Sequence, residues 1–236
     1  MSQNNSEETK QKLLFAAKIE FLEKGFQKAS LRNICKKAGV TTGALYFFFK
    51  DKEDLFSALV SGVYETLTDI FHLHLNTEHE HLEYICRTFE VSKVKTFGAV
   101  TELFDFKERE GISDDFEAGR RLFDCIYKDY ETSMLLLSKA AGTKYEFFHD
   151  ELISISQKHI KEKCAFIAEV LKCRNAPDFV IHWLAHLIID TYFGVFYHVR
   201  EKEEALKHFP IIMKGVQSAW IETFKSLFEE DGICRI

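Results

Sequence analysis

Residues 30–52 contain the side chains with the clearest capacity to bind another molecule. The hydroxyls of Thr41 and Thr42 can donate a hydrogen bond to a base edge or accept one from it, and their methyl groups can touch the methyl group of thymine. Lys50 and Lys52 have cationic ends that can pair with phosphates. Together these groups have the chemistry for holding a nucleic acid rather than for breaking a covalent bond.

Two short helices separated by a tight turn are predicted to position these groups. Ser30 is a suitable N-cap residue, because its hydroxyl can accept a hydrogen bond from a backbone N–H in the first turn. Gly39 stands where the chain leaves the first helix, since glycine adopts the left-handed conformation without a steric cost. Thr41 then caps a second helix that carries Leu45 and Phe48 inward. This is the helix-turn-helix pattern, whose second helix enters the major groove of DNA.

The same stretch resembles the DNA-binding signature of the TetR family of bacterial transcriptional regulators. Order and spacing match over roughly residues 9–56, which makes this signature more specific than a helix-turn-helix alone. The resemblance implies an all-α protein with a small DNA-binding domain and a larger helical domain that binds an effector and forms a homodimer. The matching segments are Gly25-Phe26, Ser30-Leu31-Arg32, Ala38-Gly39-Val40, Gly43-Ala44-Leu45-Tyr46 and the run Phe49-Lys50-Asp51-Lys52-Glu53-Asp54-Leu55.

The resemblance also implies roles for single residues, and here the sequence departs from the family. Family members usually have a long polar side chain at the position of Thr42, a small polar one at that of Ala44 and often a phosphate-contacting histidine at that of Phe47. We therefore expect base recognition to depend on Arg32 and on DNA shape. The expected phosphate contacts, which set register rather than specificity, are Tyr46, Lys50 and Lys52. The predicted DNA-binding set is Ser30, Arg32, Thr41, Thr42, Gly43, Ala44, Tyr46, Phe47, Lys50 and Lys52.

Composition favours a helical, cytoplasmic protein. The chain has 236 residues, 46% of them hydrophobic, and only two prolines. No apolar run approaches the ~18 residues that span a bilayer, and the polar start MSQNNSEETK lacks the apolar core of a signal peptide. The sequence also lacks a phosphate-binding glycine loop and the GxSxG and HExxH motifs. We therefore expect no enzymatic activity, no cofactor and no membrane partner.

Charge is divided unevenly along the chain, whose net charge is −6. Residues 1–56 contain ten Lys and Arg against seven Asp and Glu, a net charge of +3. Residues 57–236 contain 21 against 30, a net charge of −9. The positive surface can neutralise phosphates, while the acidic remainder repels DNA and helps to orient the approach.

Histidines and cysteines suggest two alternative sensing chemistries. His72 and His79, and likewise His74 and His81, are seven residues apart, which could indicate a metal site. Few other ligands lie nearby at suitable spacing, so we predict no metal. The six cysteines show no CxxC spacing and lie mostly among apolar residues, which predicts buried, reduced thiols. A redox-responsive or metal-responsive regulator of the same fold is therefore the alternative.

The predicted architecture has two domains, a DNA-binding domain at residues 1–54 and an effector-binding and dimerisation domain at residues 55–236. One long helix joins them. It starts at Asp51 and continues for more than five turns, and further helices lie on both sides of a turn at Gly111 and Ser113.

The last two helices are predicted at residues 178–200 and 210–228. The first is apolar on most sides, and such a helix must be buried all round. We therefore predict that these two helices from each of two chains form a four-helix bundle. Val216 and Trp220 are expected on the apolar surface of the last helix.

The effector pocket is predicted in the larger domain, where polar groups are scattered among many aromatic rings. The predicted pocket residues are Tyr127, Tyr130, His149, His159, Trp183, His186, Asp190 and Tyr192. The sequence thus favours a repressor that binds a palindromic operator in double-stranded DNA and is released by a hydrophobic or aromatic small molecule. A helical adaptor without DNA binding is the alternative from another class, and it gives residues 30–52 no role.

Overall fold

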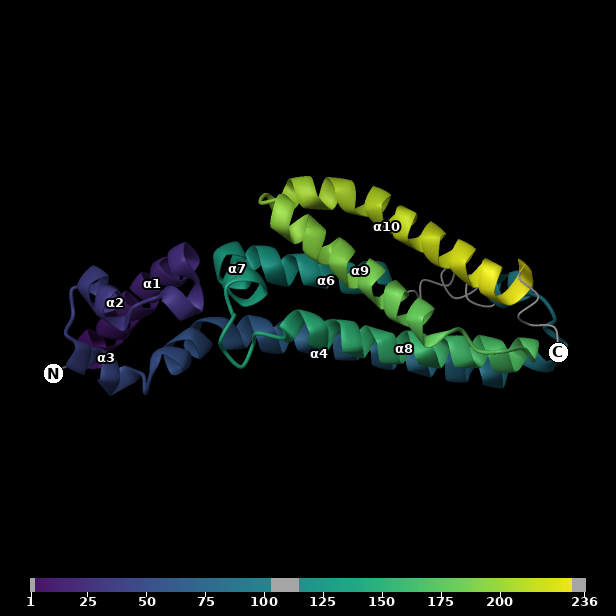
Figure 1. Ribbon diagram of the computed structural model, residues 1–236, viewed down its shortest axis with the longest axis horizontal. Helices are drawn as coiled ribbons and strands as arrows, with labels where there is room; N and C mark the ends of the chain where they lie inside the picture. Colours follow the sequence, from purple (N-terminus) through teal and green to yellow (C-terminus); the bar gives the residue numbers. More distant parts are fainter. Residues whose placement is uncertain (1–2, 103–114, 231–236) are drawn as a thin grey trace. The chain divides into compact units, whose positions relative to one another are not determined.

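The computed structural model describes residues 3–102 and 115–230, which form helices and turns without a strand. The predicted all-α fold is confirmed. The turn predicted at Gly111 and Ser113, and Cys234, lie outside the described residues. The helices, labelled as in Figure 1, are α1 (Gln3–Lys28), α2 (Leu31–Ala38), α3 (Thr42–Phe48), α4 (Lys52–Thr88), α6 (Asp115–Lys128), α7 (Tyr130–Ser138), α8 (Phe148–Leu171), α9 (Asp178–His198) and α10 (Lys202–Lys225). Residues 97–102 are also helical, and short 3-10 and π turns lie at Val91–Lys93 and Ser226–Glu230.

The chain divides into two compact units. The head unit consists of Met1–Thr68 together with Cys125–His149, and the body unit consists of Asp69–Asp124 together with Asp150–Ile236. Helix α4 is unbroken and belongs to both units. The functional boundary predicted after residue 54 therefore stays a prediction.

Three phenylalanine rings form the centre of the head unit. The ring of Phe21 on α1 lies 5.1 Å from that of Phe56 on α4, edge to face, and Phe26 lies 5.5 Å from Phe56. Phe26 follows Gly25, where the backbone leaves the helical conformation and α1 is kinked. The three rings thus fix the end of α1 against the start of α4.

Helix α7 packs on α1 within the head unit. The ammonium of Lys18 on α1 lies 2.6 and 2.8 Å from the two carboxylate oxygens of Asp129, the residue before α7. At the other end of α7, the N–H of Phe26 donates to the carbonyl oxygen of Lys139 over 3.1 Å. The sequence placed residues 125–149 in the second domain and gave no sign of these contacts.

Aromatic packing also holds α6, α9 and α10 together in the body unit. Phe123 lies 4.5 Å from the ring of Phe209 and 5.2 Å from that of Phe196. Gly119 makes this close approach possible, because a Cβ atom there would stand 2.6 Å from the Phe209 ring and 3.0 Å from the Tyr192 hydroxyl. The antiparallel pair α9 and α10 is joined by a short connection (Figure 1).

The start predicted for the last helix is wrong. Helix α10 begins at Lys202, and Pro210 lies inside it. The prediction treated proline as a helix start because its fixed φ and missing N–H suit the first turn. Glu203 and Glu204 occupy the first turn instead, where the helix dipole favours acidic residues.

Val216 and Trp220 do not lie on an outer apolar surface of α10 as predicted. Val216 is buried in the protomer. Trp220 is half-buried, with its ring 5.1 Å from that of Phe224 and the Lys163 ammonium 5.7 Å from its centroid. Both side chains therefore contribute to the fold of a single chain.

Helix α9 is, by length and composition alone, long and apolar enough to cross a membrane, a property that it shares with core helices of soluble proteins. Its inner face is buried in the body unit through Ile181, Leu184, Ile189 and Phe193. In all, 44% of the apolar stretch is buried.

Candidate nucleic-acid interface

The turn between α2 and α3 has the geometry that the sequence predicts. Gly39 adopts the left-handed conformation, with φ 68° and ψ 31°. The N–H of Val40 donates to the carbonyl oxygen of Cys35 over 3.0 Å, which closes the end of α2. The side-chain oxygen of Thr41 accepts a hydrogen bond of 3.2 Å from the N–H of Ala44 and so caps α3. The two predicted helix boundaries at this turn are confirmed.

One face of α3 is open to solvent. Leu45 is fully buried, and the opposite face carries Thr42, Gly43, Tyr46 and Phe47, all exposed. These positions follow the i, i+4 spacing of one helical face. Most of the predicted DNA-binding residues on α3 therefore lie together.

Two exposed cations belong to the same part of the head. Arg32 on α2 and Lys50 after α3 are both exposed, and neither forms an ion pair with any other described residue. The N–H of Lys50 donates to the Asp54 carboxylate over 2.9 Å, while the N–H of Asp54 donates to Asp51 over 2.8 Å. This reciprocal cap starts α4 and fixes the backbone at Lys50.

Residues 13–59 match the model of the bacterial regulatory proteins of the tetR family. The matched range begins at Leu13 in α1, includes the whole turn between α2 and α3, and ends at Leu59 in α4. This part of the chain is therefore similar to the DNA-binding domain of the TetR family. The resemblance that the sequence gives over residues 9–56 is therefore confirmed.

Curated relatives match over limited stretches. The transcriptional repressor BepR of Brucella suis biovar 1 (strain 1330) is 45% identical over 53 residues, which is 22% of this chain and 25% of BepR. The regulator AcrR of Shigella flexneri is 45% identical over 58 residues, 25% of this chain and 27% of AcrR. The uncharacterized regulator YdgC of Bacillus subtilis (strain 168) is 33% identical over 103 residues, 44% of this chain and 49% of YdgC. The chain thus spans at most about half the length of these relatives.

A solved structure of a transcriptional regulator from Aquifex aeolicus VF5 covers 90% of this chain and 97% of its own length. Its sequence identity is 16% and its TM-score is 0.44.

Lys52 is engaged inside the head unit. Its ammonium donates to the carbonyl oxygens of Gln27 and Ala29, each over 3.2 Å, and lies 4.6 Å from the centre of the Phe26 ring. Burial lowers the pKa of this ammonium. The predicted phosphate contact of Lys52 is untested, and these partners favour a structural role that ties the end of α1 to α4.

The side-chain cap predicted for Ser30 is wrong. Its backbone is extended as at an N-cap, but its hydroxyl accepts no bond from α2. Instead its backbone N–H donates to the carboxylate of Glu20 over 3.4 Å. The side-chain cap is therefore absent, and the backbone of Ser30 is instead bound to a residue ten positions away on α1.

Glu20 is fully buried and holds α1 and α2 together. Burial alone would raise the pKa of its carboxyl, but hydrogen bonds from its partners lower that pKa to about 2. Its carboxylate is therefore charged at neutral pH inside the head. The groups that reach it are the ammonium of Lys24 at 2.7 Å, the ammonium of Lys37 at 3.0 Å, the amide of Asn33 at 3.2 Å and the N–H of Ser30 at 3.4 Å.

Sequence reasoning missed Glu20, although one signal was present. It directly precedes Phe21 and lies at helical spacing from Ala16 and Ala17, all three of which are buried. A carboxylate on such a stripe must be paired or hydrogen-bonded, because an isolated buried charge is very costly.

The predicted effector residues are distributed over both units. Tyr127 and Tyr130 stack in the head unit with ring centres 5.6 Å apart, and burial raises the pKa of Tyr127 to about 12. His149 also belongs to the head unit, and His159 is buried on α8. No described pocket gathers these residues together.

The other four predicted effector residues lie on α9. Tyr192 packs in the aromatic core with its ring 5.6 Å from that of Phe209. Trp183 and Asp190 are exposed, and Nδ1 of His186 lies 3.1 Å from the Asp190 carboxylate. Three of the four therefore face outward, and the predicted pocket remains a prediction.

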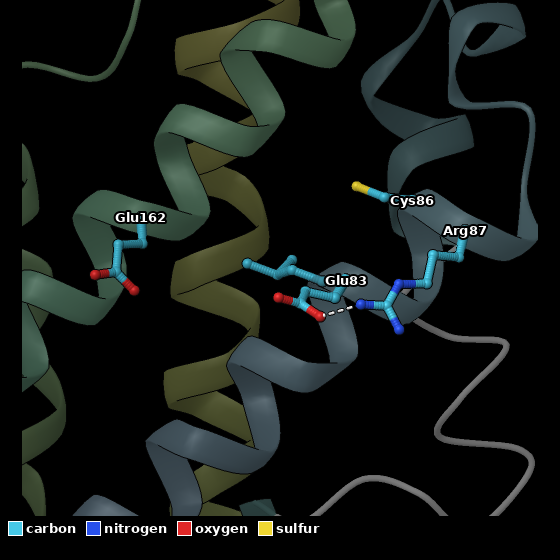
Figure 2. A pocket seen from close by; sticks show the side chains of 5 residues that line it. Glu83, Cys86, Arg87 and Glu162 are labelled. Atoms are coloured by element: carbon cyan, nitrogen blue, oxygen red, sulfur yellow. Dashed lines mark hydrogen bonds and ion pairs between the residues drawn. The ribbon is translucent and has the colours of Figure 1, made fainter.

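A hollow of about 330 Å³ opens between α4 and α8 in the body unit. Figure 2 shows Glu83 and Cys86 of α4 extending toward α8, which carries Glu162. The Arg87 guanidinium is held at 2.6 Å from the Glu83 carboxylate. Leu82 completes the lining. Sequence reasoning did not single out these residues, because exposed charges on a helix give no signal for a hollow.

The cysteines differ in accessibility. Burial raises the pKa of the Cys164 thiol to about 12 and also raises that of Cys35, so both fit the predicted inert thiols. Cys86 is exposed at the hollow, and Cys125 and Cys173 are half-buried, so the predicted burial holds for two of the five described cysteines. Among the residues that the structure describes, no group of three His, Cys, Asp or Glu side chains could hold a metal ion.

Replacing Glu20 by Gln should destabilise the head by about 1–3 kcal/mol at neutral pH, because charge-assisted hydrogen bonds are lost. The folded pKa of about 2 lies below the ordinary value of 4.5, so the stabilisation is present above pH 4.5 and lost as pH falls toward 2. Hydrogen exchange of α1 and α2 amides between pH 3 and 7 would measure it. The exposed Glu23→Gln is the control, and an equal effect of both changes at pH 7 would contradict the role of Glu20.

Proposed function

We propose that this chain is a cytoplasmic transcriptional regulator that binds double-stranded operator DNA through α3. The observation that supports it best is the open face of α3 within a helix-turn-helix that matches the family model and also carries the exposed cations Arg32 and Lys50. A helix of this kind fits the major groove, where hydroxyls and apolar groups read base edges. A helical adaptor without DNA binding would not account for the exposed face of α3.

Repression is the mode of action that we propose. BepR is a transcriptional repressor by name, and AcrR is a transcriptional regulator. A repressor needs only to occupy its operator, whereas an activator also needs a surface for the transcription machinery. No described feature points to such a surface.

The outer faces of α9 and α10 support a homodimer. Phe179, Trp183 and Tyr197 are exposed along α9 at helical spacing, and Ile211 is exposed on α10. Aromatic side chains that repeat along one helical face are typical of a subunit interface. Two-fold pairing of these helices would carry two heads, each for one half of a palindromic operator.

The hollow between α4 and α8 is the site that we propose for a small effector. Its volume of about 330 Å³ lies at the lower end of the ~300–1,000 Å³ found for ligand pockets. Leu82 and Cys86 provide an apolar side, and Glu83 and Glu162 provide polar groups at the edge. A hydrophobic or aromatic molecule with a polar substituent fits this lining. The exposed Cys86 keeps a thiol-responsive variant of the same function as the second candidate.

In this proposal, contacts inside the head unit couple effector binding to the release of DNA. The N–H of Lys144 donates to the Glu53 carboxylate over 3.0 Å, and Tyr145 lies 6.4 Å from Phe56, both near the start of α4. A ligand can shift DNA affinity only if it favours one of two conformations. Movement of α4 against residues 139–145 is the change that we propose, because it would alter the spacing of the two heads.

Lys50→Ala should reduce the salt dependence of DNA binding by about one unit, because one phosphate contact is lost. Lys52→Met should leave the salt slope unchanged and lower stability by roughly 1–2 kcal/mol, because two carbonyls lose their donor. Binding to fragments selected from genomic DNA, measured at several salt concentrations, tests both. Equal slopes for wild type and Lys50→Ala, or no binding to any fragment, would contradict this assignment.

Ile211→Glu should convert the dimer to monomers and weaken operator binding by at least tenfold, because a charge would enter an apolar interface. Gln217→Glu is the matched control, since Gln217 is also exposed and lies about a third of a turn around α10. Sedimentation velocity measures the association. A dimer in Ile211→Glu would place the interface elsewhere.

Cys86→Phe should put an aromatic ring into the hollow and weaken operator binding about 5- to 150-fold, the range of typical coupling energies. Cys86→Ser, which adds no volume, should bind DNA as the wild type does. Anisotropy titrations with labelled operator measure both. If Cys86→Phe folds normally and keeps full DNA affinity, the hollow is not coupled to the head.

A further inference from the structure

Phe47 has the most exposed side chain among the described phenylalanines of the head. It is 77% exposed, compared with 70% for Phe15 and 68% for Phe147, and it is the one of these three that lies on α3. It shares the open face of α3, the proposed groove-facing surface, with the exposed residues Thr42, Gly43 and Tyr46. A large apolar ring at this place can bury its surface only against an apolar group of a binding partner.

The Phe47 ring is held in place by its neighbours. The ring of Phe48 meets it edge to face, with centres 5.0 Å apart and planes at 89°. Phe48 in turn lies 6.4 Å from the buried ring of Phe49, whose N–H donates to the Leu45 carbonyl over 2.9 Å. This chain of contacts joins the exposed ring to the buried wall of the head. A ring fixed in this way loses little conformational freedom when it binds.

Helix α3 has few groups for hydrogen-bonded readout. Its seven residues, TGALYFF, include no Arg, Lys, Asn, Gln, Asp or Glu. Of the two threonines at its start, Thr41 already uses its side-chain oxygen to accept from the Ala44 N–H. The bidentate contacts by which proteins commonly distinguish guanine or adenine therefore cannot come from this helix.

An apolar ring can still distinguish one base in the major groove. Thymine alone among the four bases presents a methyl group there, and the other base edges present hydrogen-bond donors and acceptors. The exposed cations Arg32 on α2 and Lys50 after α3 favour a polyanion over an apolar protein surface as the partner.

We propose that Phe47 is a specificity-determining residue that packs on the 5-methyl group of a thymine at one symmetric position of each operator half-site. The inference rests on the proposed operator binding and deepens it, because it names the chemical group that is recognised. The operator should therefore carry a thymine at a fixed distance from its centre in both halves. Because the Phe47 ring is uncharged, this contact adds discrimination between bases and no salt dependence.

Deoxyuridine substitution tests this contact directly, because it removes the thymine methyl and leaves base pairing and phosphates unchanged. An operator is first selected from random duplexes with the full-length protein. Each thymine pair related by the two-fold axis is then replaced by deoxyuridine, and affinity is measured by anisotropy at one salt concentration. For one of these thymine pairs, the substitution should weaken wild-type binding roughly 15-fold. Loss of one buried methyl group lowers the affinity roughly 4-fold, and the pair loses one such group in each half-site.

Phe47→Ala should bind the unmodified operator as weakly as the wild type binds the responsive deoxyuridine operator, and should show no further loss on the latter. Phe47→Leu, which keeps apolar volume, should retain part of the deoxyuridine effect. Because the side chain is 77% exposed, both variants should keep the helical content and thermal stability of the wild type.

Three outcomes would overturn the inference while leaving operator binding intact. The wild type could show no loss at any deoxyuridine pair, Phe47→Ala could retain the full deoxyuridine effect, or Phe47→Ala could bind the unmodified operator as tightly as the wild type. A wild-type protein that selects no duplex at all would contradict the proposed function itself, and with it this inference.

Discussion

The edge-to-face contacts of Phe21, Phe26 and Phe56 are the constraint on which the position of α3 depends. A helix of seven residues is too short to be stable in water by itself. Helix α3 therefore takes its place from tertiary contacts, through fully buried Leu45 and through α4, whose first turns are fixed by Phe56. Large aromatic rings bury the most apolar surface per residue, so three of them can contribute much of the stability of a small helical unit.

The parts of the head that the sequence predicted correctly are those that depend on local contacts. Gly39, Thr41 and Asp51 mark helix ends because the groups they bind lie within a few residues along the chain. The Ser30 cap and the role of Lys52 could not be predicted in this way. Their partners lie ten and more than twenty residues away, and periodicity within one helix carries no information about such contacts.

The effector residues and the dimer surface show a second limit of sequence reasoning. Helix α9 is apolar on most sides, and the sequence does not tell a face that packs in the protomer from one that is left exposed. Tyr192 and Trp183 illustrate the problem, because the first is buried in the core and the second is 44% exposed on the opposite side. In general, the core of a subunit interface resembles a protein core in composition, so composition alone does not separate the two kinds of face. Only the packing of α6 and α10 around Tyr192 separates the two faces.

At least four of the ten Lys and Arg side chains in residues 1–56 are engaged by other groups of the head. Lys18 pairs with Asp129, Lys24 and Lys37 pair with Glu20, and Lys52 binds two backbone carbonyls. The net charge of +3 over residues 1–56 therefore overstates the cationic surface available to a polyanion. Counterion release scales with the number of phosphates that are neutralised, so a head of this kind gains less sequence-independent affinity from the backbone. More of the binding free energy must then come from contacts with the bases and from DNA shape, and the neutral, aromatic face of α3 is the surface that can supply it.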